Sequence, residues 1–235
     1  LLFTKMPTLN ANRGGFAIGQ NSTFSTCRQT ATTVSDGSFT NTGAIGYVFS
    51  AGRGRGGGTH QITRTFFHFD VSAVTGTVSS LTLNIVGATN TSSDLIVLKS
   101  TAFGGDGGTA LSTSDYFSSI DFSTAYSAEI TSWSTGTNSI TLNSTAESDI
   151  QNNNDFIVAL VNHNNDFSNS AASSSTTQKN GINFSSTSNA RLIFTETAAA
   201  AGPDNLTSLN TIAKASITSF NTITLANIDE INTIS

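Results

Sequence analysis

The 235-residue sequence contains a single cysteine, Cys27, and only two prolines. One cysteine cannot form an intrachain disulfide, and it excludes a metal site built from several cysteines. No apolar run approaches the roughly 18 residues that a transmembrane helix requires. We therefore expect a domain that is stabilised by its hydrophobic core and has no membrane segment.

Charged residues are also scarce, at 11% of the chain against about 25% in typical domains. Ser, Thr and Asn take their place. Thr favours strands, whereas Ser, Asn and Gly favour turns. The composition predicts many short strands joined by uncharged loops, which is common in extracellular and virion proteins.

Two stretches with a two-residue apolar period form the centre of the predicted core. Their apolar residues are Phe67, Phe69 and Val71 in the first, and Leu81, Leu83 and Ile85 in the second. This is the period of half-buried strands. Further strands are predicted at residues 22–33, 44–49, 94–99, 139–142, 155–161, 181–184 and 191–195, with one short helix inside 114–136 that ends at Gly136.

About eight or nine strands favour an all-β fold, an antiparallel β-sandwich of the jelly-roll type. We expect an extended N-terminal arm over residues 1–21, with a flexible point at Arg13-Gly14-Gly15. The sandwich then covers residues 22–197. An alanine-rich linker over residues 198–204 leads to a β-rich repeat tail over residues 205–235.

Three stretches and a final strand resemble the jelly-roll domains of the DNRLRE type, which are related in shape to carbohydrate-binding modules. They are R-x-F-F-x-F-D-V-S at 64–72, G-T-V-S-S-L-T-L-N-I at 76–85, E-I-T-S-W-S-T-G at 129–136 and R-L-I-F-T at 191–195. The resemblance covers residues 60–197 and implies a fold more than a function. It also implies that Trp133 packs in the core and is not a sugar platform.

The tail repeats with an 11-residue period, in stretches that begin at Leu209, Phe220 and Ile231. The pattern is Φ-N-T-I-x-x-A-x-I-x-x, where Φ is a large apolar residue. Such a period could form a hendecad helix, but the Thr and Ile content favours short strands and turns. So few repeats cannot bury their own apolar side, which comprises Leu209, Ile212, Ile217, Phe220, Ile223, Ile228, Ile231 and Ile234. The tail resembles those that end many phage structural proteins, and we predict that it is an association element.

Basic residues are concentrated near the N-terminus, where residues 1–65 contain six basic side chains and one acidic one. Arg13, Arg53 and Arg55 are predicted to grip an acidic neighbour, unless they are dispersed on separate loops. The loop that carries Arg53 and Arg55 lacks the GxxxxGK[ST] pattern of a P-loop. It has no aromatic residue between its arginines, so we do not favour nucleic-acid binding.

Candidates for chemistry are few, and we predict no catalytic residue, no metal and no other cofactor. His68 beside Asp70 is typical of a structural pair, and no G-x-S-x-G elbow is present to activate a serine. One carboxylate in the glycine-rich loop at 103–108 is too few for calcium. The oxygen-rich run at 162–166 is consistent with a metal or sugar site, and equally with a polar loop.

Two functional hypotheses follow. The first is a phage virion protein, a capsid decoration or a tail or fibre component, that associates with copies of itself and other virion proteins through its arm and its repeats. The second is a secreted carbohydrate-binding module or adhesin that uses the aromatic residues Tyr116, Phe117 and Tyr126.

Overall fold

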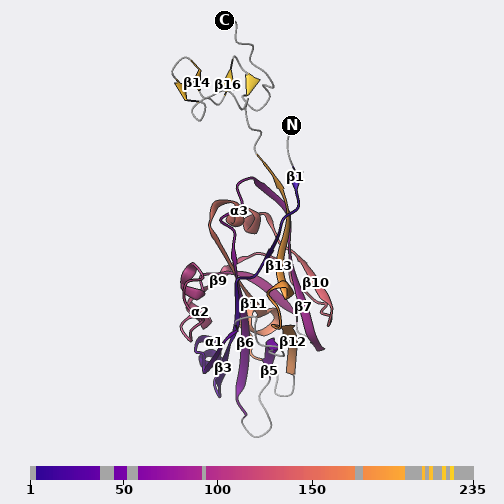
Figure 1. Cartoon of the computed structure of the whole chain (residues 1–235). Helices are drawn as coiled ribbons and strands as arrows, with labels where there is room; N and C mark the ends of the chain where they lie inside the picture. Colours follow the sequence, from indigo (N-terminus) through magenta and orange to yellow (C-terminus); the bar gives the residue numbers. More distant parts are fainter. Residues whose placement is uncertain are drawn as a thin grey trace, which may run out of the picture.

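The computed structural model describes residues 4–37, 45–51, 58–91, 94–172 and 177–198, and the pairs 208–209, 212–213, 219–220 and 223–224. Antiparallel strands dominate these residues and form two sheets packed face to face (Figure 1). The all-β sandwich predicted from composition and the two-residue period is therefore confirmed.

The first sheet is built around the C-terminal strand of the body. Its strands are β1 (Thr4–Lys5), β2 (Thr8–Asn10), β7 (Thr77–Thr91), β10 (Thr137–Thr141) and β13 (Ala190–Thr197). β13 pairs with β7 on one side and with β1 and β2 on the other. β10 pairs with the free side of β7.

The second sheet is built around the phenylalanine-rich strand β6. Its strands are β3 (Arg13–Asn21), β4 (Thr33–Gly37), β5 (Ile45–Ala51), β6 (His60–Asp70), β8 (Leu95–Ser100), β9 (Ile120–Ala125), β11 (Asp155–Asn162) and β12 (Thr177–Asn183). β3 and then β4 extend it on one side of β6. On the other side, β11 leads to β8 and β9, and β5 leads to β12.

The strand β7 joins the two sheets. It pairs with β13 and β10 up to Val86, and from Gly87 onward it pairs with β12. A Cβ atom at Gly87 would lie 1.9 Å from the carbonyl oxygen of Ser134. Only glycine therefore allows the loop after Trp133 to approach β7 at this junction.

Helical segments are short and lie between strands. They are α1 (Phe24–Gln29), α2 (Asp115–Ser118) and α3 (Ser144–Asn152), the 3₁₀ turns η1 (Phe103–Gly105) and η3 (Thr187–Asn189), and the π-helical turn η2 (His163–Phe167). The polar first strand predicted at 22–33 was wrong, because α1 occupies the middle half of it. The predicted helix is α2, and it ends well before Gly136.

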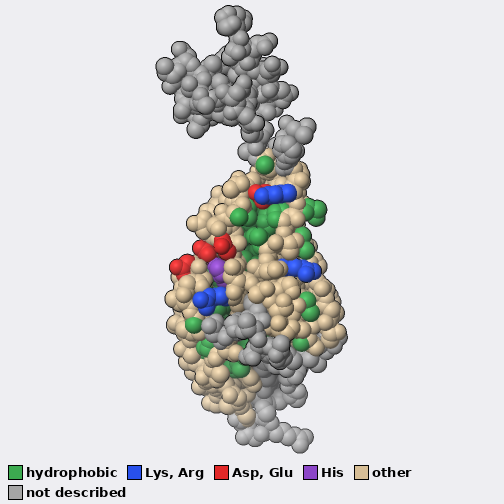
Figure 2. All heavy atoms as spheres, in the orientation of Figure 1, with side chains coloured by type: hydrophobic (Ala, Val, Ile, Leu, Met, Phe, Trp, Pro, Cys, Tyr) green, Lys and Arg blue, Asp and Glu red, His purple; other side chains and the backbone are tan. Residues whose placement is uncertain are grey.

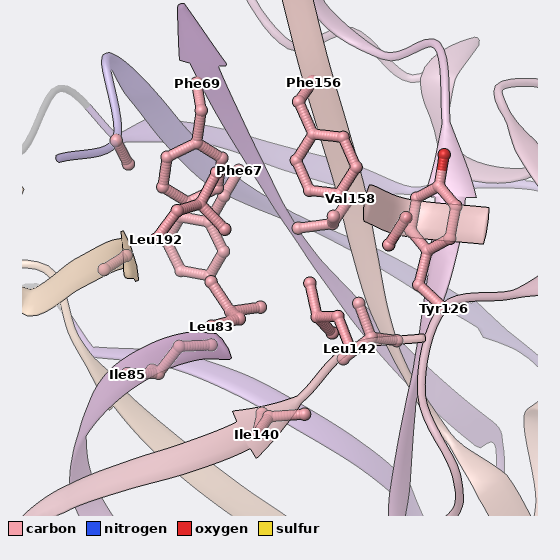
Figure 3. Packing of buried hydrophobic residues seen from close by; sticks show 14 of the residues in the cluster. Phe67, Phe69, Leu83, Ile85, Tyr126, Ile140, Leu142, Phe156, Val158 and Leu192 are labelled. Atoms are coloured by element: carbon pink, nitrogen blue, oxygen red, sulfur yellow. The ribbon is translucent and has the colours of Figure 1, made fainter. Parts of the chain in front are cut away.

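The inner core lies between the sheets and is built mainly from apolar side chains (Figure 3). It includes Phe67 and Phe69 of β6 and Leu83 and Ile85 of β7, so the two periodic stretches do face each other. The ring of Phe67 stacks on that of Phe184 with centroids 5.5 Å apart. Helix α3 closes one end of this core with Ala146 and Ile150.

A second, outer core covers the opposite face of the second sheet. It contains Ile62 and Phe66 of β6, Ile96 and Leu98 of β8, and further apolar residues from α1, α2 and η1. Both faces of this sheet are covered, and β8 accordingly has apolar residues on both of its sides. This agrees with the prediction of a central strand at residues 94–99.

The expected arm is instead built into the sandwich over residues 4–21. β3 pairs with β6 from Arg13 opposite His68 to Asn21 opposite His60. The flexible point predicted at Gly14 and Gly15 was wrong. These glycines lie opposite Phe67 and Phe66, and aromatic cross-strand partners can compensate for the missing side chains.

Candidate functional site

The repeat tail forms two small hairpins in the described residues. β14 (Ser208–Leu209) pairs with β15 (Ile212–Ala213), and β16 (Ser219–Phe220) pairs with β17 (Ile223–Thr224). Each is a two-stranded sheet separate from the sandwich. The prediction of short strands in place of a hendecad helix is confirmed for these pairs.

The register of the hairpins reproduces the period of the sequence. Leu209 pairs with Ile212, and Phe220 pairs with Ile223. The second pair lies 11 residues after the first, so each Φ-N-T-I unit corresponds to one hairpin. The other residues predicted to associate through the tail or the basic loop lie outside the described residues: Ile217, Ile228, Ile231, Ile234, Arg53 and Arg55.

A groove of about 290 Å³ runs beside β10, at one edge of the first sheet. We call it the Trp133 groove, and its lining residues are Ile130, Ser132, Trp133, Ser134, Thr137, Asn138, Ser139 and Ile140. Trp133 is half-buried against the inner core, and its Nε1 donates to the carbonyl oxygen of Gly181 at 3.1 Å. The implied packing role of Trp133 is confirmed, but part of the residue also lines this groove.

A smaller charged pocket of about 140 Å³ lies where β8 ends and β11 begins. Lys99 Nζ is 2.8 Å from Asp149 Oδ2, and the hydroxyl of Tyr126 donates to the same carboxylate. Burial and this hydrogen bond raise the pKa of Tyr126 above its ordinary value. Asp149 is therefore held by two donors, and the contacts join α3 to the end of the second sheet. Figure 2 shows one group of acidic, basic and histidine side chains at the left of the body, and smaller charged groups at its top and right.

His68 is paired with a carboxylate, but its partner is not the predicted Asp70. Its Nε2 lies 2.9 Å from Oδ1 of Asp155 on the neighbouring strand. Side chains two positions apart in a strand lie on the same face, so Asp70 shares the face of His68. It is nevertheless not the carboxylate that His68 contacts. Asp70 instead accepts hydrogen bonds from the hydroxyl and N–H of Ser72, and these lower its pKa.

A buried ion pair organises the outer core. The side chains of Arg64 and Asp166 are fully buried, and Arg64 Nε and Nη2 donate to the two carboxylate oxygens at 2.6 and 2.7 Å. The guanidinium also donates to the carbonyl oxygens of Tyr116 and Arg28 and lies 4.0 Å from the centroid of the Tyr116 ring. The pair thus ties β6 to α1, α2 and η2.

The oxygen-rich run at 162–166 is used within the fold. Asp166 binds Arg64, and the side-chain oxygen of Asn162 accepts from the N–H of Asn165 at 2.7 Å, which caps η2. Sequence reasoning missed this pair. The available signal was Arg64 itself, a charge two residues before the Phe66-Phe67 pair of the predicted core strand, where it requires a buried acid.

The three aromatic residues predicted to contact glycans have different positions. Tyr116 and Tyr126 are buried, with 0% and 1% exposure, so their rings cannot stack on a sugar and that part of the prediction was wrong. Phe117 is half-buried and lines a pocket of about 370 Å³ with Gln29, Thr30, Ala31, Thr113, Ser114 and Ser118.

The remaining candidates are also part of the fold. Arg13 is half-buried at the start of β3, so it is not on a free arm. In the residues that the structure describes, no cluster of three or more His, Cys, Asp or Glu could hold a metal ion. Nor does this part of the chain contain a helix long and apolar enough to cross a membrane.

Comparison with known proteins adds no relative: no family model matches the chain, and no curated protein matches it.

Proposed function

We propose that this chain is a non-enzymatic structural protein of a virus particle, a capsid decoration or a tail or fibre component of a phage. It is held to neighbouring copies by its C-terminal repeats. The observation that carries the proposal is the repeated hairpin: Leu209–Ile212 and Phe220–Ile223 pair in the same way, 11 residues apart.

An isolated two-stranded hairpin is marginal in water, because it cannot bury an apolar face by itself. Each tail hairpin pairs two large apolar residues, and no third strand joins either hairpin in the described residues. Burial of apolar surface contributes about 25 cal/mol per Å². A partner surface would therefore stabilise the tail, and each additional hairpin would add to the apolar area that is buried.

The body plays a different part from the one that the sequence suggested. Residues 4–21 belong to the two sheets, so they are not available as a gripping arm. We therefore propose that the tail makes the contacts between copies, and that the sandwich is the stable body that these contacts link to its neighbours.

The proposal is tested by the mass of the full chain in solution, measured by light scattering. We expect an oligomer that the double variant Leu209→Asp/Phe220→Asp reduces to single chains, because a charge then replaces the Φ residue of each repeat. The matched control, Ser216→Asp/Asn227→Asp, adds the same charges at equivalent non-apolar repeat positions and should remain an oligomer. A full chain that is monomeric at all concentrations, or a Φ variant that assembles normally, would contradict self-assembly.

Carbohydrate binding remains the second candidate, favoured by one observation. Phe117 exposes part of its aromatic ring in a pocket. The polar residues that line the same pocket carry hydroxyl or amide groups, which are the groups that bind sugar hydroxyls. A glycan array with the full chain and its Phe117→Ala variant tests it. Binding that the variant loses supports this candidate, and no binding by either protein rejects it.

A further inference from the structure

The outer edge of β10 is an open strand edge. β10 pairs with β7 on one side, and no described strand pairs with its other side. The N–H of Leu142, just after β10, donates to the carbonyl oxygen of Leu81 at 2.9 Å, which fixes the pattern of bonds. Because bonded pairs alternate along antiparallel strands, even-numbered residues bond to β7. Thr137, Ser139 and Thr141 therefore direct their peptide groups outward.

The other edges of the two sandwich sheets contain features that protect against pairing, whereas β10 does not. Charges, prolines, short strands and bulges commonly block strand edges. β9 contains Asp121 and a register shift in its pairing with β8. β1 and β2 are two and three residues long, contain Lys5 and are separated by Pro7. β4 contains Asp36. The five residues of β10, Thr-Asn-Ser-Ile-Thr, contain no charge and no proline, and the pairing with β7 is regular.

The Trp133 groove runs along this open edge. Its apolar lining consists of Ile130, Trp133 and Ile140, and its other residues are Ser, Thr and Asn. No charged side chain lines it. A segment that enters the groove thus finds apolar contacts beside a row of outward peptide groups, the combination by which sheets accept an added strand.

We propose that β10 and the Trp133 groove receive one strand of a Φ-N-T-I hairpin from the C-terminal tail of a second copy of this chain. The inference rests on the proposed function, since it names the surface that accepts the same tail. The donor hairpins match the acceptor, because the two described Φ-N-T-I units are uncharged and each already forms a two-stranded sheet to which no described third strand is paired. The apolar residues of one unit would lie against Ile130 and Trp133, the two partly exposed apolar residues of the lining.

The position at which the chain leaves the sandwich favours a second copy over the chain's own groove. β13 ends at Thr197, opposite Thr77 at the start of β7, whereas β10 begins at Thr137, opposite Val86. The nearer end of β10, Thr141, lies opposite Thr82, five residues of β7 from Thr77, which is about 17 Å at 3.3 Å per residue. The twelve residues from Thr197 to Leu209 are long enough for that distance, so the direction of the chain, and not its length, favours a second copy. β13 runs away from the groove, so its own tail would have to reverse direction to reach it.

The donor and the acceptor are different surfaces of the same chain, so the contact is heterologous. Such contacts produce rings when the rotation closes and filaments when it does not. The inference therefore predicts a head-to-tail assembly.

The test uses full-length chains. Ser139→Lys places a charge on the exposed outward edge of β10 and should reduce the assembly to single chains, and Thr137→Lys is a second variant with the same expected effect. Thr145→Lys, which adds the same charge at an exposed position on α3, is the control and should assemble normally. Thermal unfolding of each variant verifies that the sandwich is intact.

Mixing provides the sharper measurement. Leu209→Asp/Phe220→Asp has an intact groove and a damaged tail, and Ser139→Lys has the reverse. Each alone should have the mass of one chain, and an equimolar mixture should reach the mass of two. Normal assembly of both β10 variants would overturn this acceptor site, while the tail variants would still decide the proposed function. A mixture that stays monomeric would also overturn it. So would the finding that a glycan occupies the groove while the chains still assemble normally.

Discussion

The second sheet is buried on both faces, but its two cores differ in chemistry. Toward the first sheet, β6 presents Phe67 and Phe69 to a core of apolar side chains, with the buried charge of Glu196 confined to the end of β13. Toward the helices, the same strand presents Phe66 and Arg64, and the guanidinium is fully enclosed with Asp166. One strand therefore contributes to an inner core that depends on volume and shape, and to an outer core that also depends on charge pairing.

The comparison shows why the outer core is the more vulnerable to single changes. Loss of methylene groups from an apolar core costs transfer energy and leaves a cavity. Loss of one member of a buried ion pair leaves an uncompensated charge, which is costly although the intact pair contributes little net stability. The outer core gains specificity from Arg64, since the guanidinium fixes α1, α2 and η2 relative to β6.

The largest effect should come from Asp166→Asn. This change leaves Arg64 buried without its countercharge and should reduce the free energy of unfolding by about 3–5 kcal/mol. Urea unfolding of the full chain, followed by the fluorescence of Trp133, measures the loss.

The double variant Arg64→Met/Asp166→Leu separates charge from volume. With both charges removed, part of the lost stability should return, because Arg64 no longer leaves a fully buried unpaired charge and only Arg28, 3.3 Å from Asp166 and 12% exposed, loses its carboxylate partner. In the inner core, Leu83→Ala should cost about 3 kcal/mol through its cavity. If the double variant is as unstable as Asp166→Asn, the explanation based on charge pairing is wrong.

A smaller effect should appear at Glu196, a buried charge near the end of β13. Burial raises the pKa of its carboxyl group, but the N–H groups of Thr75 (3.1 Å) and Gly76 (2.9 Å) and the Lys5 ammonium (3.1 Å) outweigh burial and hold it below the ordinary value. A carboxylate with a lowered pKa stabilises the fold above its unfolded pKa of about 4.3. That contribution is lost as the pH falls through the folded pKa.

Unfolding measurements from pH 7 to pH 3 test this prediction. Wild-type stability should decline over the acidic end of the range, and Glu196→Gln should decline less steeply. Equal slopes in the two proteins would show that Glu196 does not contribute to the pH dependence.

The smallest effect should come from the half-exposed pair of Lys99 and Asp149. Their side chains are 40% and 22% exposed, so solvent screens the attraction. Lys99→Met should reduce the free energy of unfolding by less than about 1 kcal/mol. A loss comparable to that of Asp166→Asn would contradict the distinction between buried and exposed pairs.

Sequence patterns located the strands wherever apolar residues alternate or run continuously. The strands at β6, β7, β8 and β11 were predictable for this reason. β3 was not, because its glycines suggest a turn and its strand character depends on pairing with β6. α3 was also missed, although Asn143 caps it by accepting from the N–H of Ala146 at 3.1 Å, a local signal that the sequence contained.

The candidate site was predictable only in part. The 11-residue period located the tail, and the observed pairs of Leu209 with Ile212 and Phe220 with Ile223 follow that period. The open edge of β10 was not predictable, because an edge exists only once strand order is known. The buried tyrosines show the same limit, since an aromatic residue in a polar stretch can point either way.

The sequence by itself determined the class of fold, the principal strands and the repeat of the tail, because each depends on the spacing of apolar residues along the chain. The tertiary structure alone decided which charges are buried together, such as Arg64 with Asp166, and which strand edge stays open. These features depend on contacts between segments far apart in the sequence, and no local pattern encodes them.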